Sequence, residues 1–290
     1  MDYEIRPLTP GFGAEIYNLD LSAGVSENLA RDIVGAWNDA GGLLVLHDQD
    51  LTSQQHIELS RHFGPLFGDP NESPLQDTVS RYIHPEHPEI YRVSNQVDSK
   101  GAPTGRKGAG TYWHSDVSFR DRPAQASLLH AKTIPPVGGD TIFADQAAAY
   151  DALSDAMKEM LAPLKAWHDF AVAAQTQYAK PIVVKQDMDG ANRALHPLVR
   201  TNPETGRKSL FVNPGFTAHI DGFNDDESQA LLAFLYQHSI KPQFLYRHRW
   251  SEKDLVIWDN RSLMHLAVMN YTDDQPRYME RCTVIGEAPV

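Results

Sequence analysis

The sequence predicts a mainly β protein, a jelly roll or β-sandwich with flanking helices packed on its outside. Short strand-like segments recur along the chain, and Gly, Pro and Asn turn signals separate them, which is typical of all-β cores. Amphipathic stretches that begin with N-cap residues lie between some of these segments. The chain shows neither an internal repeat nor a hinge-like linker, so we expect a single domain over residues 1–290.

The N-terminal part predicts strands and two helices. Residues 3–21 predict a strand, a turn and a second strand. Residues 26–38 form an amphipathic pattern that begins with a serine, a preferred N-cap residue. The apolar run 43–46 is typical of a buried strand, and a second helix is expected to begin after Thr52 and to end at Gly64.

The composition changes between residues 69 and 110, where proline and glycine become frequent. We interpret this segment as long loops that enclose one strand near residues 90–93. Long loops within a compact domain are usually functional lids or disordered segments. Because the segment directly precedes the metal-ligand motif described below, we predict an active-site lid over residues 69–110.

The rest of the chain predicts further short strands and two helices. The turns are marked by the Pro-Pro-Val-Gly-Gly-Asp run and by Asn-Pro-Glu-Thr-Gly. The expected helices cover residues 146–161 and 225–239, and the expected strands cover residues 127–131, 141–144, 194–200, 209–212, 244–250, 254–258 and 281–285.

Charge and composition exclude several classes of function. A net charge of −12 makes a nucleic-acid partner unlikely, although a local arginine cluster still allows a small anionic substrate. With only Cys282 present, the chain has no intramolecular disulfide and no multi-cysteine zinc site. The sequence shows no secretory signal and no apolar run of about 18 residues, so we expect a cytoplasmic protein without a membrane partner. The sequence is also compatible with a homo-oligomer.

A short motif, His114 and Asp116 with one residue between them, predicts a metal site. If this segment is extended, side chains two residues apart point to the same face, so the imidazole and the carboxylate converge. They would be two ligands of a 2-His-1-carboxylate site, which leaves open positions on a non-haem Fe(II). His265, beyond the turn sequence at residues 258–260, is the best candidate for the third ligand. Taken singly, such residues are more often ordinary surface or core side chains than metal ligands.

Two arginines beyond His265 predict an anion site. Arg277 and Arg281 are four residues apart, so on a strand both side chains lie on one face. Arginine binds carboxylate and sulfonate groups through paired N–H donors. Thr141, directly after a glycine-rich turn, is placed to donate its hydroxyl to the same anion. The ordinary alternative is a solvated strand face.

The chain resembles the taurine / 2,4-dichlorophenoxyacetate dioxygenase family of Fe(II)- and 2-oxoglutarate-dependent oxygenases along nearly its whole length. The resemblance is strongest in residues 113–119, 135–141, 195–200, 210–217 and 258–261. It implies a double-stranded β-helix, which agrees with the jelly roll expected above.

The resemblance also implies the roles of the candidate residues. His114, Asp116 and His265 would hold Fe(II), and 2-oxoglutarate would chelate the metal through its keto acid end. Arg277 and Thr141 would bind the far carboxylate of 2-oxoglutarate. Arg281 would face the anionic group of the primary substrate, because a buried unpaired charge is costly. O₂ would complete the reaction, which releases succinate and CO₂ and hydroxylates an aliphatic carbon.

The sequence departs from taurine enzymes of this family around the substrate. Asp69 and Glu72 fall near the positions of a His and a Tyr, and Gly110 falls near that of an Asn. The two carboxylates are placed to accept an amine if the substrate is zwitterionic, or are plain loop residues.

Several functions therefore stay open. The main prediction is a dioxygenase for a small organic acid: a sulfonate, a sulfate ester or a carboxylate. A taurine dioxygenase proper, which releases sulfite, is the alternative. A non-redox metal hydrolase using the same ligands is more distant, because the chain lacks a His-Glu-x-x-His helix. A non-catalytic binding protein is the third class.

Overall fold

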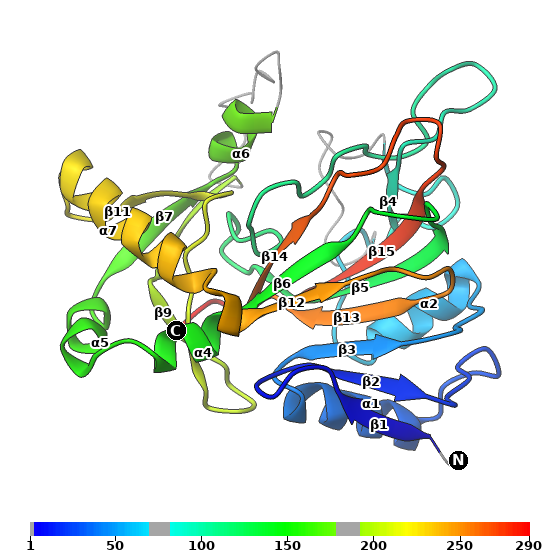
Figure 1. Cartoon of the computed structure of the whole chain (residues 1–290), viewed down its shortest axis with the longest axis horizontal. Helices are drawn as coiled ribbons and strands as arrows, with labels where there is room; N and C mark the ends of the chain where they lie inside the picture. Colours follow the sequence, from blue (N-terminus) through cyan, green and yellow to red (C-terminus); the bar gives the residue numbers. More distant parts are fainter. Residues whose placement is uncertain (1–2, 70–81, 178–191) are drawn as a thin grey trace.

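The computed structural model describes residues 3–69, 82–177 and 192–290, and these residues form a mainly β protein (Figure 1). Two β-sheets enclose a common apolar layer, and helices cover the outside. The jelly-roll core that the sequence predicted is confirmed. None of the helices in the described ranges combines the length and hydropathy that a membrane span requires.

The larger sheet has seven strands in the order β1-β2-β3-β13-β5-β15-β4. All neighbouring pairs are antiparallel except β2 and β3, which are parallel. Its strands are β1 (Glu4–Pro7), β2 (Ala14–Tyr17), β3 (Leu43–Leu46), β13 (Leu255–Asp259), β5 (Ala124–Thr133), β15 (Tyr278–Ile285) and β4 (Tyr91–Ser94).

The smaller sheet of the core is antiparallel and has the order β12-β6-β14, with β12 at Leu245–His248, β6 at Thr141–Asp145 and β14 at Leu263–Ala267. Phe143 of this sheet and Trp258 and Met279 of the larger sheet belong to one buried apolar cluster. Burying side chains of this size contributes roughly 1.5–3 kcal/mol each. The cluster therefore joins the two sheets, and the metal motif lies at one end of the layer between them.

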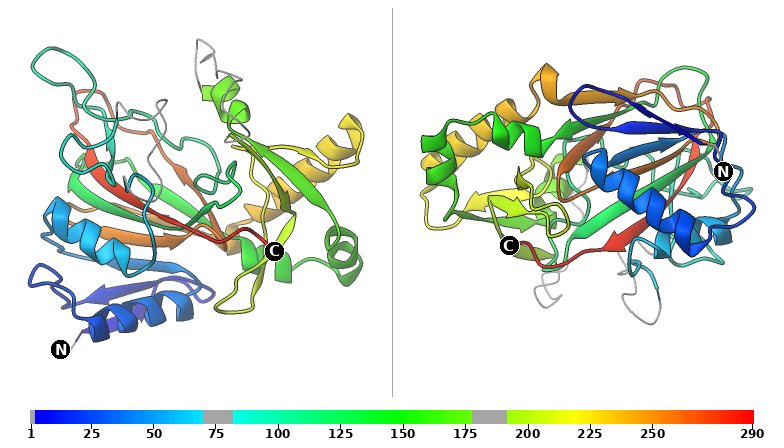
Figure 2. Two further views of the ribbon diagram at one scale, coloured as in Figure 1. Left: turned by 180° about the vertical axis from the view of Figure 1, so that it is seen from behind. Right: turned by 90° about the horizontal axis from the view of Figure 1, so that it is seen from below.

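Two N-terminal helices cover the outer face of the larger sheet, α1 (Glu27–Asp39) and α2 (Ser53–Arg61) (Figure 2). Both begin where the sequence placed a cap. The Ser26 hydroxyl accepts a hydrogen bond from a backbone N–H of α1, and Thr52 forms a capping box with Gln55. Leu29, Ile33 and Trp37 of α1 are buried in a separate apolar cluster, between the helices and the larger sheet.

A second group of elements lies beside the jelly roll and has its own apolar cluster (Figures 1 and 2). It contains a three-stranded sheet in the order β11-β7-β8 and the hairpin β9–β10. Its elements are β7 (Lys165–Asp169), β8 (Arg193–Pro197), β9 (Val199–Thr201), β10 (Lys208–Leu210), β11 (Thr217–Ile220), α4 (Gln146–Asp151), α5 (Asp155–Leu161), α6 (Phe170–Gln177), α7 (Asp225–Ser239) and the short 3-10 helix η1 (Pro242–Phe244).

Two expected elements are each divided in the structure. The helix expected over residues 146–161 is two helices, α4 and α5, because the Ser154 hydroxyl accepts from the Met157 N–H and starts a new helix. The strand expected over residues 194–200 is divided at Leu198, which lies between β8 and β9; its N–H donates to the carbonyl of Leu164, next to β7, and its carbonyl accepts from the Phe211 N–H, next to β10.

Strands β7, β11 and β14 were not predicted from the sequence. The omission of β14 matters most, because this strand carries His265. The predicted lid falls partly outside the described residues, since residues 70–81 are not among them. Its described remainder consists of loops around β4 and reaches the metal motif at Gly110.

Candidate active site

Backbone pairing brings His114 and His265 together. The His114 N–H donates to the His265 carbonyl at 3.0 Å, and the His265 N–H donates to the His114 carbonyl at 2.8 Å. This isolated bridge is antiparallel, so the two imidazoles leave the backbone on the same side. Asp116 lies two residues further on, and the ligand atoms of all three buried side chains lie within 4.8 Å of one another. The structure thus brings together the three residues that the sequence singled out.

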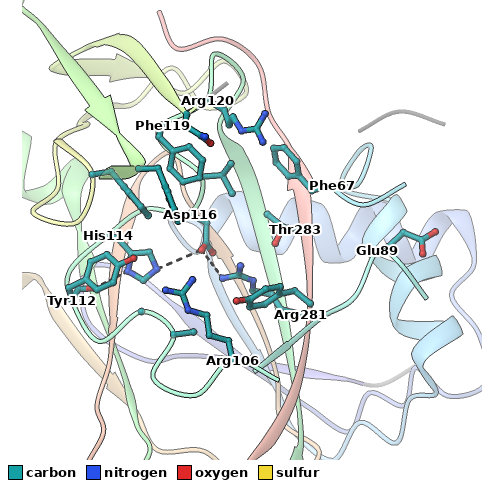
Figure 3. A pocket seen from close by; sticks show the side chains of 17 residues that line it. Phe67, Glu89, Arg106, Tyr112, His114, Asp116, Phe119, Arg120, Arg281 and Thr283 are labelled. Carbon is teal, nitrogen blue, oxygen red and sulfur yellow. Dashed lines mark hydrogen bonds and ion pairs between the residues drawn. The ribbon is translucent and has the colours of Figure 1, made fainter. Parts of the chain in front are cut away.

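Hydrogen bonds orient the first imidazole and the carboxylate toward each other. Nδ1 of His114 lies 2.8 Å from the Tyr112 carbonyl and donates to it, which leaves the lone pair of Nε2 directed at Asp116. The distance from this Nε2 to Oδ1 of Asp116 is 3.7 Å, and Nε2 of His265 lies 3.9 Å from Oδ2. Figure 3 shows His114 and Asp116 side by side in the cavity.

Three further residues hold the Asp116 side chain and its backbone. Ser127 donates to Oδ2 at 2.7 Å, and Arg281 donates to Oδ1 at 2.7 Å. The Asp116 N–H donates to the Asn260 side chain, which in turn donates to the Ser127 hydroxyl. Sequence reasoning missed Ser127 and Asn260, although Asn260 lies within a segment that resembles the family.

Electrostatics favour a cation at this point. Burial acts to raise the pKa of Asp116, but the adjacent Arg281 guanidinium outweighs it, so this pKa lies well below the usual range. Burial, with a contribution from His114, lowers the pKa of His265 far below its usual value. An ionised carboxylate and neutral imidazoles are the donor set of a 2-His-1-carboxylate metal site, and the residues therefore fit Fe(II).

A cavity next to these ligands contains Arg277 and Thr141 together with His114, His265 and Arg281. Arg277 is buried and has no carboxylate partner among the described residues. Its Nε makes no hydrogen bond, and its Nη2 donates only a long bond of 3.4 Å to the Gly139 carbonyl. Burial lowers the pKa of this guanidinium, as expected for a cation without a counterion. The cavity therefore fits an anion beside the metal ligands.

Arg277 and Arg281 line this same cavity, as their spacing predicted. The expectation that Arg281 is an unpaired charge is wrong, because its Nη1 forms the ion pair with Asp116. The register of β15 on β5, which sets Arg281 opposite Leu129, places it within reach of this carboxylate. Its Nε is buried and has no hydrogen-bond partner among the described residues, so it can donate to a further acceptor.

A second, larger cavity also borders the ligand set, at His114 and Asp116 (Figure 3). Its wall contains six Phe and Tyr side chains and also carries three arginines. Asp116 lies between Arg120 at one end of the view and Arg106 and Arg281 at the other. The aromatic residues are Phe67, Tyr91, Tyr112, Phe119, Phe170 and Phe216. The sequence analysis assigned no role to them, although Phe119 and Phe216 lie within the segments that resemble the family.

Of the two loop carboxylates singled out in the sequence, only Asp69 lies among the described residues, and it does not line this wall. Asp69 pairs with Arg61 at 3.3 Å and is not among the lining residues. Glu72 lies outside the described residues. At Gly110 the backbone has φ +72°, and an added Cβ would lie 2.7 Å from Cε1 of His114. No asparagine fits there unless the imidazole moves.

Comparison with known proteins agrees with these observations. The family model "Taurine catabolism dioxygenase TauD, TfdA family" matches residues 4–283. An alpha-ketoglutarate-dependent 2,4-dichlorophenoxyacetate dioxygenase of Cupriavidus pinatubonensis is 35% identical over 100% of both chains. A putative alpha-ketoglutarate-dependent sulfonate dioxygenase of Schizosaccharomyces pombe is 33% identical, over 99% of this chain and 70% of that protein.

A solved structure shows the same similarity. AAD-2 in complex with Mn(II) and N-oxalylglycine superposes with a TM-score of 0.81 at 33% identity, over 100% of this chain and 99% of that chain. These matches confirm the predicted class of enzyme, a 2-oxoglutarate-dependent dioxygenase. The chain therefore belongs to the TauD, TfdA family of dioxygenases.

Proposed function

We propose that this enzyme uses Fe(II), 2-oxoglutarate and O₂ to hydroxylate an aliphatic carbon of a small organic acid, and that it releases succinate and CO₂. One observation carries the proposal: a buried arginine without a counterion, Arg277, shares a cavity with the His114–Asp116–His265 ligand set. A metal chelator with a second carboxylate fits this cavity, because it can bind a metal at the ligand set and Arg277 at the same time.

In this proposal His114, Asp116 and His265 hold the iron. Bound Fe(II) supplies the oxidative chemistry, and the protein supplies geometry, anion binding and a dry pocket. Ser127 and Asn260 keep the carboxylate in one orientation, which limits the reorganisation that metal binding would require. Arg277 and Thr141 bind the distal carboxylate of 2-oxoglutarate.

The primary substrate lies in the larger, aromatic cavity. Arg281 offers its Nε to the anionic group of the substrate while Nη1 retains Asp116. The aromatic wall favours an apolar body next to the reacting carbon, because such a body gains free energy by leaving water. Relatives named for 2,4-dichlorophenoxyacetate and for (S)-phenoxypropionate support an acid of this kind.

Taurine itself fits less well. It is small and zwitterionic, and Asp69, one of the two carboxylates expected to meet its amine, pairs with Arg61 and is not among the residues that line the cavity. A sulfonate or sulfate ester with a larger apolar body remains within the proposed class, as relatives named for sulfonates and sulfate esters indicate. Hydroxylation at a carbon that bears a sulfonate would release sulfite.

The test is succinate formation from 2-oxoglutarate with a panel of phenoxy acids, alkyl and aryl sulfonates, sulfate esters and taurine. We expect at least one acid with an apolar body to stimulate succinate formation well above the rate without substrate, and taurine to stimulate it less. If taurine were the best substrate, the assignment of the aromatic cavity would be wrong. If no acid stimulated turnover, the proposed substrate class would fail.

A further inference from the structure

A tryptophan outside the proposed ligand set contacts the cosubstrate cavity through Thr141. The indole Nε1–H of Trp250 donates to Oγ1 of Thr141 at 3.0 Å, and both side chains are buried. An indole N–H is only a donor, so the threonine oxygen must be the acceptor of this bond. The direction of this hydrogen bond therefore depends neither on a histidine tautomer nor on the rotation of a hydroxyl group.

This direction determines what the Thr141 hydroxyl can do. A hydroxyl has one proton and two lone pairs. One lone pair is used by Trp250, and no acceptor for the proton is found within the ranges that the structure describes. Thr141 lines the cavity that also contains Arg277. Its O–H is thus left to donate to an anion in that cavity, and accepting one hydrogen bond strengthens the donor through polarisation.

Neighbouring residues keep the indole in place. His248 packs edge-on against Trp250 with ring centroids 4.6 Å apart and an interplanar angle of 86°. His248 donates to Asp254 at 3.1 Å, and the same carboxylate oxygen accepts from the Ser251 N–H at 2.8 Å. Backbone pairing of His248 with Thr141 in adjacent strands fixes the distance between the two ends of this arrangement.

We propose that Trp250 is a positioning residue for the cosubstrate: it holds and polarises the Thr141 hydroxyl so that this hydroxyl donates to the distal carboxylate of 2-oxoglutarate. The inference rests on the proposed function, which places that carboxylate between Thr141 and Arg277. Trp250 itself touches neither the cosubstrate nor the metal.

The test compares two ligands on the full-length enzyme loaded with Mn(II), by calorimetry. N-oxalylglycine carries the distal carboxylate of 2-oxoglutarate, whereas oxalate chelates the metal without it. Trp250→Phe keeps an aromatic ring and removes the N–H. We expect the affinity for N-oxalylglycine to fall about five- to tenfold, as for the loss of one hydrogen bond, and the affinity for oxalate to stay unchanged. An equal loss for both ligands, or no loss, would overturn the inference.

Two substitutions of Thr141 distinguish a positioning role of Trp250 from a role in packing alone. In Thr141→Val the hydroxyl is absent, so adding Trp250→Phe should not weaken N-oxalylglycine further. In Thr141→Ser the hydroxyl is present, so the loss should return. A loss that persists in the valine background would show that Trp250 acts only through packing and would contradict the proposal.

Two further variants complete the experiment: a matched control for Trp250→Phe and a separate test of the proposed function. Nε1 of Trp37 is buried and makes no hydrogen bond within the described part of the chain. Trp37→Phe is therefore the same chemical change without a lost bond and should leave both affinities unchanged. Arg277→Met tests the proposed function itself. If Arg277→Met weakens N-oxalylglycine and Trp250→Phe does not, only the role of Trp250 is wrong. If neither does, the distal carboxylate lies elsewhere and both assignments fail.

Discussion

Asp116 is the residue at which the contacts of the site converge. One carboxylate oxygen accepts from Ser127 and the other from Arg281, while its N–H is held by Asn260. In the proposed function Arg281 therefore has two tasks, because it balances the charge of Asp116 and also offers its Nε–H to the substrate anion. Removal of Arg281 leaves a buried carboxylate with one fewer partner and an aromatic cavity with less positive charge.

Arg281→Ala, assayed at saturating Fe(II), should reduce substrate-stimulated succinate formation at least tenfold. The substrate anion loses a charged donor, whereas Arg277 and Thr141 still bind the cosubstrate. The measurements are the rate of succinate formation and the dissociation constant of N-oxalylglycine. A large loss of N-oxalylglycine affinity, with the response to substrate intact, would instead place Arg281 in the cosubstrate site.

Arg277 gives a second prediction at this scale. Its guanidinium is buried without a carboxylate partner. Arg277→Met should weaken the binding of 2-oxoglutarate by roughly 2–5 kcal/mol, the usual effect of removing one partner of a buried charge pair. Keto acids without a distal carboxylate should be poor cosubstrates for the wild-type enzyme. If pyruvate supported turnover as well as 2-oxoglutarate does, the role given to Arg277 would be incorrect.

At the scale of elements, the site depends on how β14 lies against the segment that carries the metal motif. The His-x-Asp spacing sufficed to predict that His114 and Asp116 share a face. It did not predict that His265 lies in a strand directly opposite His114, because pairing between distant segments is set by the whole sheet and not by local sequence. The ion pair between Arg281 and Asp116 escaped prediction for the same reason.

Local signals were reliable where a single residue decides the outcome. Ser26 and Thr52 cap helices as predicted, since a cap needs only one side chain and the N–H groups of the next turn. Ser154 is the counterexample. The apolar pattern of residues 146–161 continues past Ser154, which is the N-cap of a second helix, so one helix was predicted where two exist.

The close approach of the loop at Gly110 to His114 gives a third prediction. Gly110→Ala adds a Cβ that would lie 2.7 Å from the imidazole, at a backbone φ of +72°. We expect the affinity for Mn(II) to fall about tenfold or more, because displaced ligands lose their geometry. Gly101→Ala is the matched control: its φ is +80°, but no atom lies within 4 Å of the added Cβ. Equal metal affinities for the two variants would contradict this account of the loop.

At the scale of the whole molecule, several histidines are buried in neutral form. Burial lowers the pKa of His130 and of His196 to about 4, and that of His168 to about 3. His130 lies in β5, an interior strand of the larger sheet, and the other two pack against each other in the second group of elements. The folded protein therefore binds fewer protons than the unfolded chain once the pH falls below about 6.5.

The sign of the effect follows from this difference in protons bound. Above about pH 6.5 each of these buried histidines leaves the free energy of unfolding unchanged. As the pH falls from about 6.5 toward 4, each one lowers the free energy of unfolding by about 1.4 kcal/mol per pH unit. We expect one cooperative unfolding transition, as for a single domain, whose free energy declines steeply between pH 6.5 and 5. Denaturant unfolding at several pH values measures it. A free energy of unfolding that stays constant over this range would contradict the neutral burial of these side chains.

The central claim is that His114, Asp116 and His265 hold an iron that 2-oxoglutarate chelates. The most direct measurement is the visible absorption spectrum of the protein with Fe(II) and 2-oxoglutarate under anaerobic conditions. The account predicts a weak metal-to-ligand charge-transfer band for the wild type and for Asp69→Ala, whose side chain does not line either cavity. It predicts no band for Asp116→Ala, although the far-UV circular dichroism of that variant should remain that of the folded protein. A wild type without the band, or a folded Asp116→Ala protein that retains it, would contradict the account.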